Sequence, residues 1–215
     1  MTQRVFNIDF ETMGGPRSGK PILLDVAACV WDLDGGLPDY GDLIKETTQI
    51  KLDIRSQKEQ GRIVDPGTKE WWSKQGERAR QVLQPTPDDH TIKQAMEKLL
   101  DWLDSKYIDP RNALAFCRGQ SFDFPLLEGA IDDAGLSHRD PYRFFNQMDV
   151  RSYLKGLYAD PRARKFALPK GWLDENFVKH DSRCDVAKDA GLIQYGQQLA
   201  RGEVNPNMET DVEWV

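Results

Sequence analysis

The first apolar residues of the chain alternate with polar ones from position 5 to position 14, which is the period of a β-strand. Successive side chains of a strand point to opposite faces, so this strand has an apolar face and a polar face. The apolar face carries Phe6, Ile8 and Phe10. The polar face carries Asn7, Asp9 and Glu11. The pattern therefore predicts a buried strand that bears two acids.

Further apolar runs of strand length predict strands over 23–31 and 47–52, separated by turn sequences such as Asp34-Gly35-Gly36. Together with the first strand they predict an antiparallel meander. Two short buried strands are expected over 113–117 and 146–150. Helical patterns are expected over about 69–82, 91–103, 124–134, 151–157 and 182–200, and a helical turn over 173–177. The intervals 53–65 and 158–171 are expected to be irregular.

This order of elements predicts a mixed α/β fold in which a three-stranded antiparallel meander is followed by parallel strands and flanked by helices. Residues 1–200 are expected to form a single domain, which suits a chain of 215 residues. Residues 201–215 are polar, contain Pro206, and are expected to be a fraying C-terminal tail.

Composition adds that the chain is a packed globule with an acidic total charge, since 39% of its residues are hydrophobic, six are Trp, and the net charge is −6. Any contact with phosphate must then come from a local basic patch. Such a patch lies between positions 151 and 171, where one acid, Asp160, faces six basic residues. These are Arg151, Lys155, Arg162, Arg164, Lys165 and Lys170. The run is either a track for a nucleic-acid backbone or a solvated loop.

The three cysteines, Cys29, Cys117 and Cys184, are widely spaced and odd in number, which favours free thiols in a reducing compartment. The N-terminus lacks the pattern of a signal peptide, and no apolar run approaches the 18 residues of a membrane span. We therefore expect a cytoplasmic protein with no membrane association.

Asp9 and Glu11 would lie roughly 6.8 Å apart along one face of their strand, where two carboxylates repel each other and resist desolvation. A bound cation is the simplest group that makes this pair favourable. The alternative is a strand that ends at Ile8 and leaves both acids in a solvated turn.

Two further sites carry acids near predicted helix starts. Asp123 follows the strand over 113–117, and the carboxyl ends of strands are where sites gather in α/β sheets. His180 precedes a helix that Asp181 or Ser182 caps, with Asp185 on the first turn. Each site has a simpler interpretation: Asp123 as an acid favoured by the helix dipole, and the segment after His180 as a solvated helix end.

Trp71 and Trp72 are adjacent on a predicted helix, where they point about 100° apart and cannot both face the same core. One is expected in the core. The other either stacks on a base or covers a loop.

These motifs resemble those of the DEDDh 3′→5′ exonucleases, in particular the group of phage exonuclease A and related exoribonuclease-like proteins. The shared stretches are Asp9-Phe10-Glu11-Thr12-Met13-Gly14, Glu70-Trp71-Trp72, Cys117-Arg118-Gly119-x-Ser121-Phe122-Asp123-Phe124-Pro125, Leu168-Pro169-Lys170-Gly171 and His180-Asp181-Ser182 with Asp185. The similarity spans about residues 5–200. It departs from most DEDDh enzymes at Gly119, where they carry Asn, so a substrate contact assigned to that Asn is in doubt here.

The resemblance implies an RNase H-like fold and a 3′→5′ exonuclease that releases 5′-mononucleotides from single-stranded nucleic acid with a free 3′ end. It implies two divalent cations, Mg²⁺ or Mn²⁺, with Asp9 shared by both, Glu11 and Asp185 at the attacking water, and Asp123 at the second ion. His180 is then the general base. Substrate contacts are expected from Thr12, Met13, Trp71, Phe122, Arg162, Arg164 and Lys165, with Phe122 a core residue otherwise.

Single-stranded DNA is the expected substrate, and RNA is the main alternative. Two other classes share the fold: a nucleic-acid-binding protein whose nuclease site has degenerated, and an RNase H-like endonuclease. The presence of all five expected catalytic residues counts against the first class. The His180-x₄-Asp185 spacing counts against the second.

Overall fold

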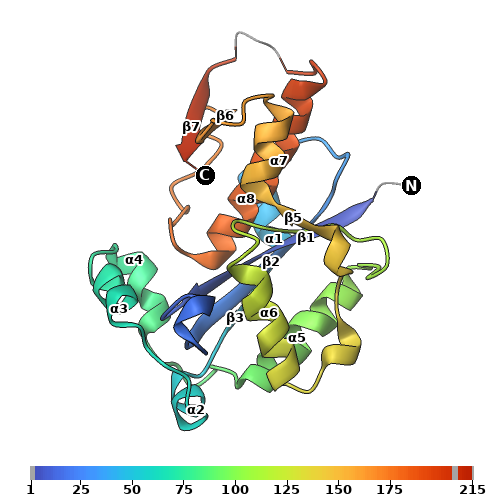
Figure 1. Cartoon of the computed structure of the whole chain (residues 1–215). Coiled ribbons are helices and arrows are strands. Elements are labelled where there is room, and N and C mark those ends of the chain that lie inside the picture. Colours follow the sequence, from blue (N-terminus) through green and yellow to red (C-terminus); the bar gives the residue numbers. More distant parts are fainter. Residues whose placement is uncertain (1–2, 205–207, 215) are drawn as a thin grey trace.

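The alternating segment near the N-terminus forms β1 (Arg4–Thr12), the central strand of a five-stranded sheet in a computed structural model that describes residues 3–204 and 208–214 (Figure 1). Strand order across the sheet is β3-β2-β1-β4-β5. The other strands are β2 (Leu23–Asp32), β3 (Thr47–Lys51), β4 (Ala115–Cys117) and β5 (Gln147–Asp149). The acids of β1 therefore lie within the strand, and the alternative of a strand ending at Ile8 is wrong.

Pairing in the sheet is antiparallel on one side of β1 and parallel on the other. β1 pairs with β2, and β2 with β3, as an antiparallel meander. β4 runs parallel to β1, and β5 runs parallel to β4. The predicted mixed sheet is confirmed, and its parallel half brings the carboxyl ends of β1, β4 and β5 to one edge.

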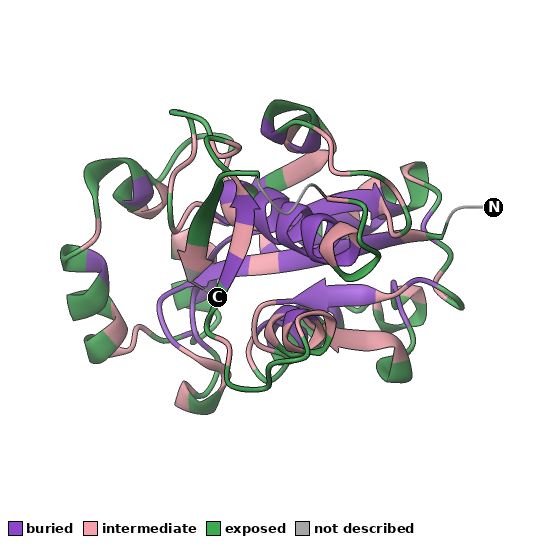
Figure 2. Cartoon of the chain, turned by 90° about the horizontal axis from the view of Figure 1, so that it is seen from above, coloured by how far each residue is buried: buried purple, intermediate pink, exposed green. Residues whose placement is uncertain are grey.

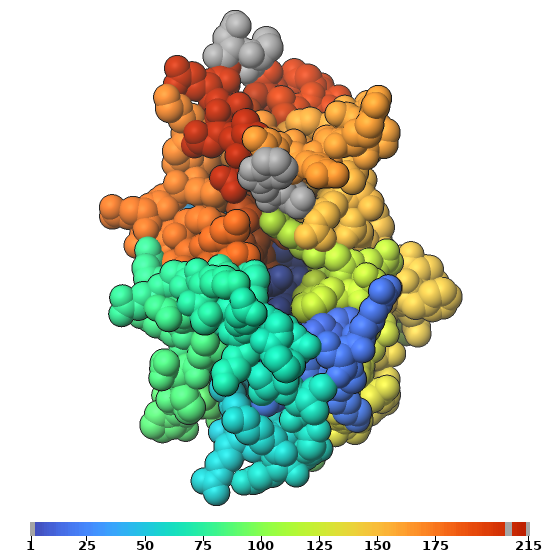
Figure 3. Space-filling model, turned by 60° about the vertical axis from the view of Figure 1, so that its left-hand side comes forward, coloured from blue at the N-terminus to red at the C-terminus, as the bar shows by residue number. Residues whose placement is uncertain are grey.

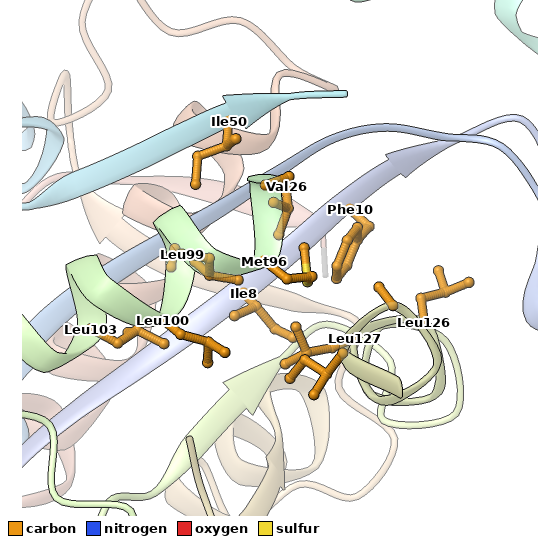
Figure 4. Packing of buried hydrophobic residues seen from close by; sticks show 14 of the residues in the cluster. Ile8, Phe10, Val26, Ile50, Met96, Leu99, Leu100, Leu103, Leu126 and Leu127 are labelled. Atoms are coloured by element: carbon orange, nitrogen blue, oxygen red, sulfur yellow. The ribbon is translucent and has the colours of Figure 1, made fainter. Parts of the chain in front are cut away.

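Helices cover both faces of the sheet. α5 (Ile92–Ser105) and α6 (Asp123–Asp133) pack on the face that carries Phe6, Ile8 and Phe10, as the close view of this core shows (Figure 4). On the opposite face, α1 (Tyr40–Lys45), α7 (Val150–Leu157) and α8 (Ser182–Ala200) contribute to a second core with Val5, Ala27 and Cys29. The inner strands β1, β2 and β4 are mostly buried between these layers, whereas the edge strands β3 and β5 are mostly of intermediate exposure (Figure 2). Asp9 and Glu11 point toward the layer that holds α8, because they alternate with Ile8 and Phe10.

Short helices between β3 and α5 depart from the expected pattern. α2 (Ile54–Glu59) lies in the interval expected to be irregular, and the Asp53 carboxylate caps it by accepting the Ser56 N–H. The helix expected over 69–82 is interrupted: it consists of α3 (Pro66–Ser73), α4 (Glu77–Arg80) and a 3₁₀ turn, Gln81–Leu83. Gly76 separates α3 from α4, which accounts for the break. Other 3₁₀ turns are Pro16–Ser18, Ser137–Arg139 and Phe144–Asn146.

The C-terminal part differs most from expectation. β6 (Lys165–Pro169) lies in the interval expected to be a loop, and β7 (Thr210–Trp214) lies in the expected fraying tail. The two strands pair antiparallel, and β6 buries Phe166 and Leu168 in the second core. The turn over 173–177 is not helical, and Pro206 lies outside the described residues. Pairing with β6 is therefore what orders residues 210–214.

The three cysteines are free and buried, as their spacing predicted. In the described ranges, helices fall short of the length and apolarity needed to cross a bilayer.

Candidate active site

The floor of the site is the carboxyl end of β1. Glu11 is 8% exposed, and Asp9 is half-buried on the same face of the strand. Asp25 on β2 pairs with Glu11 in the antiparallel register, and its carboxylate accepts the Glu11 N–H at 3.4 Å. The other oxygen of Asp25 accepts the Gln49 amide at 2.7 Å. Asp25 thus holds the strand segment that presents Glu11.

Asp123 approaches this floor from the start of α6. It is 2% exposed, and its Oδ1 accepts the backbone N–H of Phe10 at 3.2 Å. The hydrogen bond attaches the start of α6 to β1 between the two acids of the strand. Asp123 therefore sits beside Asp9 and Glu11, as the parallel arrangement of β1 and β4 predicts.

His180 and Asp185 come from the entrance to α8. Asp181 caps the helix by accepting the Cys184 N–H at 3.1 Å, and Asp185 reaches back to accept the His180 N–H at 2.9 Å. Potential ligand atoms of Glu11, His180 and Asp185 all lie within 4.8 Å of one another. The structure thus brings together all five residues that the sequence singles out.

Without a bound cation, the surroundings of this cluster disfavour the ionised form of its acidic side chains. Burial raises the pKa of Asp9 and Glu11 well above their ordinary values, and repulsion from neighbouring acids adds to the effect. Burial also raises the pKa of Asp123 to about 7. Hard oxygen donors gathered in this way fit a divalent cation, whose charge offsets the repulsion and the desolvation.

A buried lysine and a half-buried arginine lie beside the acids. Lys188, 2% exposed, donates from Nζ to Asp185 Oδ1 at 2.8 Å. Arg118 forms a bidentate pair with Asp189, in which Nε donates to Oδ2 at 3.0 Å and Nη2 to Oδ1. Burial lowers the pKa of both basic groups. Asp189 is therefore a partner of Arg118, and α8 does not begin as a solvated acidic end.

A cavity of about 660 Å³ opens above the cluster. It appears as the hollow in Figure 3, with dark blue β1 at its base between the orange segment before α8 and the yellow-green start of α6. Its acidic and imidazole lining consists of Asp9, Glu11, Asp65, Asp123, His180 and Asp185. Basic residues at its wall are Arg118, Arg151, Lys179 and Lys188.

The expected substrate residues divide into two groups. Thr12, Trp71 and Phe122 line the cavity, and Phe122 also packs against the core. Met13 is buried under Trp72 instead, and Arg162, Arg164 and Lys165 lie outside the cavity lining. Substrate contacts stay a prediction for both groups. For the three basic residues they would form part of a longer track.

Trp71 and Trp72 differ in burial, as the helical geometry predicts. Trp72 is 1% exposed, and its indole N–H donates to the Thr12 carbonyl at 2.9 Å, which ties α3 to the end of β1. Trp71 is 39% exposed and packs edge-to-face on His180, with ring centroids 4.8 Å apart. The exposed Trp71 ring thus forms part of the site wall.

Comparison with known proteins shows similarity to exonucleases. A family model described as the 3′-5′ exoribonuclease Rv2179c-like domain matches residues 4–191. The exodeoxyribonuclease of Enterobacteria phage T4 is 34% identical over 209 residues, covering 92% of this chain and 90% of that protein.

Solved structures share the fold at low sequence identity. The nuclease domain of 3′hExo, a DEDDh family member bound to rAMP, superposes with a TM-score of 0.56 at 15% identity, covering 100% of this chain and 98% of that one. E. coli exonuclease I in complex with a dA16 oligonucleotide gives 0.56 at 15% identity, covering 94% of this chain. This chain spans 42% of that exonuclease I chain, so it corresponds to one part of the longer protein.

Sequence similarity defines the class, which is a 3′-5′ exonuclease, and the fold is shared with the DEDDh family member described above. The chain belongs to the family of 3′-5′ exoribonuclease Rv2179c-like domains. Use of a divalent metal follows from this membership, and the carboxylate and imidazole cluster suits it. The alternative of a degenerate, non-catalytic fold is not favoured.

Proposed function

We propose that this protein degrades single-stranded DNA from a free 3′ end and releases 5′-mononucleotides, with two divalent cations, Mg²⁺ or Mn²⁺, bound at the acid cluster. The supporting observation is the convergence of Asp9, Glu11, Asp123, His180 and Asp185 on one cavity. The T4 relative, named as an exodeoxyribonuclease, supports DNA. An exoribonuclease with the same site is the second candidate, supported by the family's description.

Asp9 would hold both cations, Glu11 and Asp185 the one nearer His180, and Asp123 the other. When bound, the cations lower the pKa of the attacking water and neutralise the charge that develops on the leaving oxygen. Hard carboxylate ligands favour Mg²⁺ or Mn²⁺ over zinc.

His180 takes the proton from the attacking water in this proposal. The backbone N–H of His180 is fixed by Asp185 and its ring is braced by Trp71, so the imidazole faces the acid cluster. Burial lowers the pKa of His180. The neutral form needed for a general base is therefore present at neutral pH.

Thr12, Trp71 and Phe122 are the proposed contacts to the terminal nucleotide, because they line the cavity beside the acids. An aromatic face such as that of Trp71 accepts any base by stacking, which suits an enzyme that removes nucleotides regardless of sequence. We place the reaction in the cytoplasm of a bacterium or a phage-infected host.

Digestion of matched DNA and RNA oligomers labelled at the 3′ end tests this function, with Mn²⁺ or Mg²⁺ present and product length read directly. The expected first labelled product is a mononucleotide, released faster from single-stranded DNA than from RNA or duplex. Faster release from RNA would favour the exoribonuclease candidate.

A circular single strand and two variants complete the test. The circle is expected to stay intact, since it has no end, and cleavage of it would contradict an exonuclease. Asp9→Asn is expected to lower activity on the order of 10³-fold or more, because metal assistance is worth several kcal/mol. Asp53→Asn, at an N-cap outside the cavity where Asn caps equally well, is expected to match the wild type.

A further inference from the structure

Gly119 lies in the segment between β4 and Asp123 and has a backbone φ of +124°, a conformation that residues with a side chain rarely adopt. A β-carbon at this position would lie 3.3 Å from the Nη1 of Arg151, tighter than most such contacts. The missing side chain at Gly119 therefore leaves the space that the Arg151 guanidinium occupies.

Arg151 reaches this space from the start of α7. The helix follows β5, whose last residue, Asp149, pairs in the sheet with Cys117 at the end of β4. Nη1 of Arg151 donates to the carbonyl of Arg118 at 3.0 Å, and the half-buried side chain lines the cavity with Asp9 and Asp123. The hydrogen bond holds the guanidinium at the cavity wall.

The charge of this guanidinium acts on the acid cluster from one side. It lowers the pKa of Asp123, against the larger upward effect of burial. Within the described ranges, the ion pairs formed at 4.0 Å or less do not include Arg151. A guanidinium has five N–H donors, so donors remain for an oxyanion in the cavity.

His180 and Asp185 come from the entrance to α8, and the orange segment there lies across the hollow from the yellow-green start of α6 (Figure 3). Under the proposed function, the attacking water lies on the His180 side. In-line displacement then puts the leaving 3′ oxygen on the side of Asp123 and Arg151. The strand that remains after cleavage continues from that oxygen, and its next phosphate follows within one nucleotide.

We propose that Arg151 binds the phosphate immediately upstream of the scissile bond, as a substrate-positioning residue that takes the place left open by Gly119. This assignment rests on the proposed function. Through this contact the site distinguishes a strand that has an upstream phosphate from a substrate that is a single phosphodiester. Only the strand offers the guanidinium a phosphate to bind.

Three substrates isolate this contact: a normal DNA oligomer, the same oligomer with one neutral methylphosphonate at the upstream linkage, and the p-nitrophenyl ester of thymidine 5′-phosphate, which has no upstream phosphate. Arg151→Met is expected to lower kcat/KM on the normal oligomer by about 10- to 100-fold, mainly through KM, as for loss of charge-assisted hydrogen bonds. On the methylphosphonate oligomer and the ester, the variant and the wild type should agree within about twofold. Arg151→Lys should restore part of the loss on the normal oligomer, because it keeps the charge.

Arg55→Met is the matched control, since Arg55 is an exposed arginine on α2 that lies outside the cavity lining. It should leave all three substrates unaffected, with melting temperatures showing that each variant is folded. Equal losses on all three substrates with Arg151→Met, or no loss on any, would overturn the assignment. Inactivity of the wild type on every substrate with Mn²⁺ would contradict the proposed function itself.

Discussion

His180 has a backbone φ of +63°, in the left-handed region that costs energy for a residue with a side chain. Its N–H is held by the Asp185 carboxylate, whose second oxygen accepts Lys188. The spacing of four residues between His180 and Asp185 thus has a local reason: an acid on the first turn of α8 fixes the residue before the helix. Asp185 positions the histidine as well as facing the cluster.

The pH dependence of the reaction tests His180 as the base. Because burial lowers the pKa of His180 below its ordinary 6.5, protonation removes the base only under acidic conditions. With saturating Mn²⁺, kcat/KM is expected to rise with pH and to reach half of its plateau value below pH 6.5. His180→Asn is expected to lower kcat/KM by about 10²- to 10⁴-fold. Its pH profile should also lack the acidic limb. An acidic limb that persists unchanged in His180→Asn would assign the titration to another group.

Several residues of the site could be predicted from the sequence and others could not. The five motif residues stand in short patterns whose spacing fits a strand or a helix start. Asp25, Arg118 and Lys188 were not among the predicted site residues. The partners of Asp25 and Arg118 come from distant elements, whereas Lys188 pairs with Asp185 three residues before it on α8. A lone Asp within the apolar run at 23–31 was the available signal for Asp25, because an unpaired buried acid needs hydrogen bonds.

The helix α3 carries two adjacent aromatic rings that lie in different environments. Trp72 anchors the helix to β1 and fills a small core with Met13 and Ile22. Trp71, the preceding residue, lines the cavity and packs on His180. The buried ring therefore sets the position of the exposed one.

Substitution of the two rings is expected to separate stability from activity. Trp72→Phe leaves the buried Thr12 carbonyl without its donor, so we expect a loss of about 1–3 kcal/mol in the free energy of unfolding. Trp71→Ala is expected to keep the unfolding free energy within about 0.5 kcal/mol, the usual range for surface positions, while raising KM for oligomers. Denaturant unfolding and steady-state kinetics on the same preparations measure both. A Trp71→Ala variant with unchanged KM and kcat would contradict its place in the site.

Elements with a strong period were predicted well, and so were the short strands β4 and β5, but α2, β6 and β7 were not. α5, α6 and α8 follow from apolar spacing and caps, which are local properties. β6 and β7 are short, and their order depends on pairing between segments about 45 residues apart, as in Lys165 with Trp214. The interruption between α3 and α4 depends on one glycine inside an otherwise helical pattern.

For the whole molecule, the acid cluster lowers stability unless protons or cations bind. The pKa of Asp123 in the folded protein is about 7, against an ordinary 3.8. The folded state therefore binds more protons than the unfolded state between these values, and its stability falls as pH rises from about 4 to 7. The raised pKa values of Asp9 and Glu11 act in the same direction. Above this window, divalent cations are the ligands that restore stability.

Thermal melting with and without Mn²⁺ at pH 7.5 and pH 5 is the sharpest test of whether the acid cluster binds divalent cations. Binding to the native state alone must raise the melting temperature, by about 5–10 °C at a hundredfold excess over the dissociation constant for a chain of this size. The predicted result is a large rise at pH 7.5, a smaller one at pH 5, and its loss in Asp9→Asn but not in Asp53→Asn. An unchanged melting temperature in the wild type, or an equal rise in Asp9→Asn, would show that divalent cations do not bind at the acid cluster.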